Sequence, residues 1–139
     1  VEQVLDFVRT DELPRAIQTM TTHAALLASY TARRGGTPLT MLAYEGGQHL
    51  VGVGEVQSDA RATALFHGAN RHATMGTLYG QYLDAWRRNN GQLFVHFVHT
   101  QLPTEWGVFG LIERPDQSRA ESPKLDAVLR FVEQNPRWW

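Results

Sequence analysis

Leu42-Ala43-Tyr44-Glu45-Gly46-Gly47-Gln48-His49 is an apolar segment that ends in a carboxylate, with two glycines directly after that carboxylate. Together with the residues before it, this segment predicts a strand over residues 38–44 that is buried on both faces. Parallel α/β sheets carry their chemistry at the carboxyl ends of their strands. Glu45 is therefore the first candidate for a functional residue in this chain.

A second buried strand is predicted over residues 93–98, where the sequence is again almost wholly apolar. Helical spacing of apolar residues predicts helices before, between and after the two strands, over residues 1–8, 11–34, 61–69, 75–86 and 123–132. Thr10 or Asp11 is expected to cap the long helix that precedes the first strand. Strands separated by a helical crossover pair in parallel, so the sequence predicts an α/β fold of parallel βα units.

The predicted strands are too few to complete a sheet of this kind. A chain of 139 residues is one domain, residues 1–139, whereas a closed barrel of eight parallel strands takes about 250 residues. The second face of both strands is apolar and needs partners that this sequence does not contain. We therefore expect a segment of a larger fold, with a large exposed apolar patch, that forms an oligomer or a complex. The first residue, Val1, agrees with a processed chain or a piece of a longer one.

Composition excludes several classes of partner and of site. Hydrophobic residues make up 42% of the chain, and the formal net charge is −1 without charge clusters, so neither a nucleic-acid nor a membrane-surface partner is expected. No apolar run approaches the roughly 20 residues of a membrane span. The chain has no cysteine, which excludes disulfides and thiolate metal sites but leaves the cellular compartment open.

Glu45 has a functional and a structural interpretation. Regular alternation places Glu45 on the same strand face as Met41 and Ala43, at the mouth of a barrel-like sheet. A carboxylate there can act as a nucleophile, a general base or a metal ligand. It can equally cap the following glycine turn or form a salt bridge. The spacing alone leaves these alternatives open.

The histidines do not predict a metal site, and no cofactor is expected. No pair of them has the HExxH spacing of a helical zinc site. His96 differs from the others because it interrupts an apolar strand. It is either a core histidine satisfied by hydrogen bonds or a polar group in the same mouth as Glu45.

Trp106 lies in the loop after the second strand, between Glu105 and Gly107. An exposed tryptophan beside a carboxylate suits a sugar, because the apolar ring face stacks while hydroxyl groups form hydrogen bonds. The alternative is a tryptophan that packs over the end of the sheet.

A series of short motifs follows in order along the chain, from about Leu13 to its end: Ala43–Leu50, Asn70-Arg71, Met75–Tyr79, Gly91–Phe97, Trp106–Leu111, Ser122-Pro123-Lys124 and Asn135-Pro136. With these motifs the chain resembles the carboxyl-terminal part of bacterial glycoside-hydrolase-like (β/α)8 barrel proteins of the cellulase-like or cellulose-binding type.

The resemblance implies that residues 38–45 are the seventh strand of a TIM barrel and residues 93–98 the eighth. Glu45 would then be the nucleophile of a retaining glycosidase. The acid/base glutamate, which such chemistry requires about 5–5.5 Å from the nucleophile, would lie in the barrel half that this chain lacks.

The expected function is thus the nucleophile-bearing portion of a retaining glycoside hydrolase-like barrel that acts on a β-linked polysaccharide or oligosaccharide. The alternative is a non-catalytic carbohydrate-binding or structural module. In both cases carbohydrate is the expected ligand, and the chain associates with the rest of the barrel. The substrate-binding residues expected around Glu45 are Tyr44, Gln48, His49, His96 and Trp106.

Overall fold

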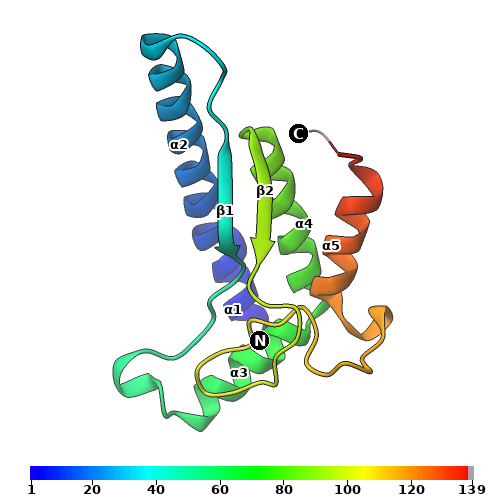
Figure 1. Cartoon of the computed structure of the whole chain (residues 1–139). Helices are drawn as coiled ribbons and strands as arrows, with labels where there is room; N and C mark the ends of the chain where they lie inside the picture. The colour runs from blue at the N-terminus through cyan, green and yellow to red at the C-terminus, as the bar shows by residue number, and fades with distance from the viewer. Residues whose placement is uncertain (138–139) are drawn as a thin grey trace.

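The computed structural model describes residues 1–137 and has a mixed α/β fold with a two-stranded parallel sheet (Figure 1). The strands are β1 (Met41–Gly46) and β2 (Gly91–His96). The helices are α1 (Glu2–Phe7), α2 (Leu13–Arg34), α3 (Ala60–Arg71), α4 (Ala73–Arg88) and α5 (Pro123–Gln134), with short 3₁₀ turns at Gly54–Val56 and Arg119–Glu121. The prediction of parallel βα units is confirmed.

The amino-terminal region is one continuous helical stretch, and the predicted break before the long helix is wrong. A π-helical segment, Val8–Glu12, joins α1 to α2. The Thr10 hydroxyl donates to the Asp6 carbonyl 2.9 Å away and does not cap a new helix. Pro14 removes one backbone donor from the first turn of α2, and the helix accommodates this with the wider π turn just before it.

α2 and α4 cover one face of the sheet. Met20 from α2, Met41 from β1, and Ala85 and Trp86 from α4 form a buried apolar cluster between these elements. α5 packs against α4 in turn, so α2, α4 and α5 form a layer on a single side of the strands, and α1 and α3 lie near the carboxyl ends of the strands (Figure 1). Among residues 1–137, no helix combines the length and the hydrophobicity that a membrane crossing requires.

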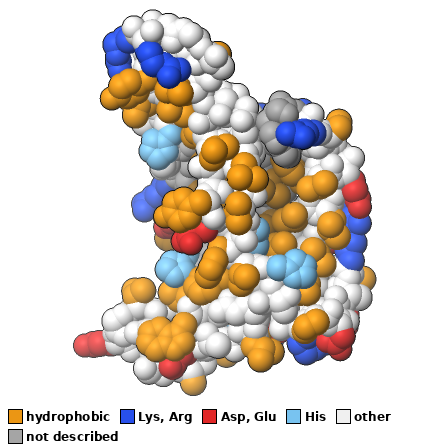
Figure 2. Space-filling view, in the orientation of Figure 1, with side chains coloured by type: hydrophobic (Ala, Val, Ile, Leu, Met, Phe, Trp, Pro, Cys, Tyr) orange, Lys and Arg blue, Asp and Glu red, His pale blue; other side chains and the backbone are white. Residues whose placement is uncertain are grey.

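The other face of the sheet is uncovered, so the prediction that both strands are buried on both faces is wrong within this chain. Its apolar side chains, which we call the open face, are 43% to 86% exposed and belong to Leu42, Tyr44, Leu93, Val95 and Phe97. Hydrophobic side chains gather over the strands in Figure 2. The expected exposed apolar patch is therefore confirmed, since the helices that flank the strands all lie on the opposite side.

An irregularity in the sheet changes the orientation of Glu45. Ala43 pairs with Phe94 and Gly46 pairs with His96. Between these two pairs β1 therefore contains one more residue than β2, as in a β-bulge. Ala43 and Gly46 consequently both face the helices, while Tyr44 and Glu45 between them are both exposed. The prediction that Glu45 shares a face with Met41 and Ala43 is wrong, because it assumed a regular strand.

Candidate functional site

Glu45 borders a surface hollow of about 270 Å³ at the carboxyl ends of the two strands. β1 supplies Glu45 and Gly46, and the loop after it supplies Gly47, Gln48 and His49. Phe97, directly after β2, and Phe109 complete the lining. The carboxylate side chain is exposed. The strand ends thus bring one acid and three ring-bearing side chains together.

The segment after β1 is shaped by a glycine and held by Gln48. Gly47 has a φ of 145°, and a Cβ there would lie 2.9 Å from Cε1 of His96. The Gln48 backbone N–H donates to the Tyr79 hydroxyl over 3.2 Å, and burial raises the pKa of that hydroxyl, which keeps it protonated.

The Gln48 side chain acts within the protein. Its Nε2 donates to the Val108 carbonyl over 2.5 Å, and its Oε1 accepts from the Leu50 N–H over 2.6 Å. Gln48 was expected among the substrate-binding residues. The structure places it in the lining of the hollow but engages both ends of its amide group in the fold, so that its contribution is to hold the segment Gly47–Leu50.

An aromatic wall stands beside Glu45. The rings of His49 and Phe109 are 5.2 Å apart, and those of Phe97 and Phe109 are 5.9 Å apart. His49 and Phe97 are exposed. His49 was predicted from the sequence, whereas Phe97 and Phe109 were missed. Phe97 could have been found from its position at the end of the second strand, because neighbouring parallel strands end at the same edge.

His96 lies on the other side of the sheet from Glu45, against the helices. Its Nε2–H donates to the Phe109 carbonyl over 3.1 Å, and its ring lies 5.5 Å from that of Tyr79. Burial lowers the pKa of His96. Of the two interpretations of this residue, the geometry matches the core histidine satisfied by hydrogen bonds, and His96 does not join Glu45 at the hollow.

Trp106 and Tyr44 are exposed but do not line the hollow. The backbone N–H of Trp106 donates to the Thr104 hydroxyl within a tight turn that closes at Gly107. Gly107 packs closely on Phe109, since a Cβ on this glycine would lie 2.5 Å from the Phe109 ring. The tryptophan therefore projects from a turn that borders the aromatic wall, and Tyr44 belongs to the open face.

Within the described chain, Glu45 is the only carboxylate that lines the hollow. Glu113 is engaged elsewhere, in a bidentate ion pair with Arg71 at 2.8 and 3.1 Å. No group of three or more histidine and acidic side chains in residues 1–137 is arranged to hold a metal ion. The arrangement provides a single exposed carboxylate with aromatic surroundings.

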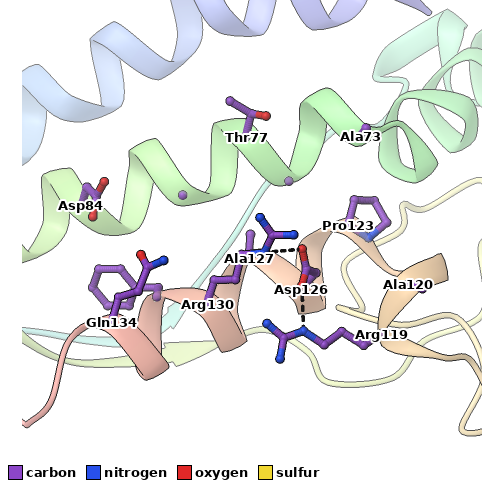
Figure 3. Close-up of a pocket in the computed structure, with 13 residues that line it drawn as sticks. Ala73, Thr77, Asp84, Arg119, Ala120, Pro123, Asp126, Ala127, Arg130 and Gln134 are labelled. Carbon is purple, nitrogen blue, oxygen red and sulfur yellow. Dashed lines mark hydrogen bonds and ion pairs between the residues drawn. The ribbon is translucent and has the colours of Figure 1, made fainter.

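A larger groove of about 810 Å³ lies between α4 and α5 (Figure 3). Three of its charged side chains pair with one another: Asp126 accepts from Arg119 at 2.7 Å and from Arg130 at 2.8 Å. Small residues of α4, Gly76 and Gly80 among them, line its other wall. None of the residues expected at the functional site borders this groove.

No family model matches the chain, and neither the search of curated proteins nor that of solved structures finds a significant match.

Proposed function

We propose that the hollow beside Glu45 binds a sugar unit of a β-linked polysaccharide or oligosaccharide. The observation that supports this most is the combination of one exposed carboxylate with an aromatic wall at the carboxyl ends of two parallel strands. A carboxylate accepts hydrogen bonds from sugar hydroxyl groups, and aromatic rings pack against the apolar faces of the sugar ring.

We further propose that the chain is the nucleophile-bearing portion of a retaining glycoside hydrolase-like (β/α)8 barrel, with β1 as the seventh strand and β2 as the eighth. Two features support this proposal. The strands are parallel with helices on one side only, and their other side is apolar and uncovered. The lumen side of a TIM barrel is filled by such apolar side chains from all eight strands.

In that assembly Glu45 would attack the anomeric carbon, and a second carboxylic acid about 5–5.5 Å away would protonate the leaving oxygen. Further strands, packed on the open face, would supply the second carboxyl group. Glu45 lies on the same side as Tyr44, toward those strands, so its exposed position agrees with this role.

The second candidate function is a non-catalytic carbohydrate-binding module. It is favoured by the single carboxylate at the hollow within the described residues, because hydrolysis with retention needs two. In this case Glu45 would only bind hydroxyl groups, and no partner would need to contribute an acid.

Glu45→Gln separates these functions, with Glu55→Gln as the control because Glu55 is exposed but does not line the hollow. We would measure the affinity of the chain for β-linked gluco-, xylo- and manno-oligosaccharides by calorimetry. Hydrolysis of the same oligosaccharides would be measured with a preparation that contains this chain and the rest of the barrel. If the chain is part of a glycosidase, Glu45→Gln should lower the rate of hydrolysis by at least about a thousandfold while the oligosaccharide still binds.

A binding module predicts no hydrolysis by either protein and weaker binding by Glu45→Gln. If Glu45→Gln and Glu55→Gln both keep the affinity and the hydrolysis of the parent chain, Glu45 has neither role. If no oligosaccharide binds at all, the proposed carbohydrate function is wrong.

A further inference from the structure

Lys124 is the only lysine in the sequence, and it is a buried cation with 3% of its surface exposed. It is the second residue of α5. Its Nζ donates to Oδ1 of Asn70 over 2.9 Å and to the Val108 carbonyl over 2.8 Å. Lys124 therefore joins α5 to the end of α3 and to the loop that carries Phe109.

Its surroundings offer neutral acceptors and no direct ion pair within the described chain. Asn70 is equally buried, and its Nδ2 donates to the Phe66 carbonyl over 2.9 Å, which fixes Oδ1 toward the ammonium. Glu113 is the charge that favours the protonated lysine, and it is itself paired with Arg71. Burial of a charge among neutral groups costs free energy, and the two hydrogen bonds of the ammonium offset part of this cost.

The Val108 carbonyl is shared between two donors. It accepts from Nζ of Lys124 over 2.8 Å and from Nε2 of Gln48 over 2.5 Å, and Val108 itself is 1% exposed. Gln48 in turn holds the Leu50 N–H through Oε1. A short chain of hydrogen bonds thus runs from the buried ammonium to the segment that lines the hollow beside Glu45.

We propose that Lys124 is a positioning residue for the Glu45 hollow: its ammonium fixes the Val108 carbonyl, which fixes the Gln48 side chain and with it Gly47–Leu50. That this segment borders a sugar site depends on the proposed function, but the mechanical coupling does not. A lysine suits the place because its compact ammonium offers three donors, whereas a guanidinium is a wide planar fork.

The coupling predicts that Gln48 responds to the charge of Lys124. Burial lowers the pKa of Lys124 to about 8, so its proton is lost within an accessible pH range. The charged or titratable groups that face it are Glu113 with its partner Arg71, His96 from β2, and Glu121, which borders the same small cavity. Loss of the proton turns a charge-assisted hydrogen bond to Val108 into a weaker neutral one.

Nuclear magnetic resonance of the whole chain tests this without any sugar. Selective ¹⁵N labelling of lysine gives one Nζ signal, whose titration reports Lys124 directly. The Leu50 amide and the Gln48 side-chain amide are then followed over the same pH range. We expect both to shift with the midpoint of the Lys124 signal, and we expect this shift to vanish in Lys124→Met.

Gln48→Ala is the matched variant, because it removes the link and leaves the lysine. In Gln48→Ala the Lys124 signal should still titrate while the Leu50 amide no longer follows it, and Leu50 amide exchange should quicken at least tenfold. The proposal is overturned if the Leu50 and Gln48 amide signals do not change during the Lys124 titration in the unmodified chain. It is also overturned if the Leu50 signal follows this titration equally in Gln48→Ala. A failure to bind sugar would contradict the proposed function and leave these results intact.

Discussion

A Cβ atom on Gly46 would lie 2.3 Å from Cζ of Phe94, so the backbone of β1 rests directly on this ring. Phe94 is fixed in turn by edge contacts to Tyr82 and Trp86 of α4, at centroid distances of 5.7 and 5.5 Å. Gly46 must therefore face the helices. The extra residue of β1 then sends Glu45 to the opposite side, beside Tyr44.

Gly46→Ala should destabilise the fold by about 1–3 kcal/mol, because the methyl group overpacks the Phe94 ring. Urea unfolding measures the difference. Gly80→Ala is the control: the space beside Gly80 in α4 is open, and alanine should stabilise this helix by about 0.8–1 kcal/mol. Equal midpoints for Gly46→Ala and the parent chain would contradict the close contact with Phe94.

Lys124 should make the chain more stable in mild alkali than at neutral pH. Its pKa of about 8 in the folded chain is below its ordinary 10.5, so between these values the unfolded chain binds more protons and stability rises with pH. Relative to Lys124→Met, the free energy of unfolding should increase by roughly 2 kcal/mol between pH 7 and pH 10. If the free energy of unfolding changes with pH in the same way in the parent chain and in Lys124→Met, Lys124 is not buried as a cation.

His96 should contribute to loss of stability in acid. Burial lowers its pKa in the folded chain below the ordinary 6.5, so below that pH the unfolded chain takes up a proton that the folded chain resists. His96→Gln keeps a donor for the Phe109 carbonyl and removes the titration. Its free energy of unfolding should fall less steeply than that of the parent chain between pH 7 and pH 5, as measured by urea unfolding at each pH.

The open face should tolerate polar substitution. Tyr44→Ser and Leu93→Ser replace side chains that are 86% and 49% exposed, so each should change stability by less than about 1 kcal/mol. Both should reduce the binding of a fluorescent dye for apolar surfaces. Leu83→Ser, at a buried position of α4, should cost several times more. A parent chain that binds no dye would show that this face is covered.

The sequence was sufficient for the elements that depend on local pattern. Two apolar runs separated by an amphipathic helix gave the parallel βα order, and the count of strands gave the exposed apolar face. The position of Glu45 at a strand end also followed from the pattern. These features depend on which residues are apolar and how far apart they lie, and that information is local.

The details of the site were less predictable because they depend on contacts between distant segments. The bulge that turns Glu45 to the open face follows from the fit of Gly46 under Phe94, on another strand. Phe109 joins the hollow from a loop without regular structure. Lys124 looks like an ordinary charged residue at a helix start, and its burial requires α3 and the Val108 loop together.

Mapping an oligosaccharide by nuclear magnetic resonance tests the central claim most directly. Amide signals of the ¹⁵N-labelled chain would be recorded during titration with β-linked glucose, xylose and mannose oligomers, for the parent and for Glu45→Gln. The hollow predicts concentration-dependent shifts centred on Gly46, Gly47, His49 and Phe97, altered in Glu45→Gln. Shifts confined to the groove between α4 and α5, or no shifts with any oligomer, would contradict a carbohydrate site at Glu45.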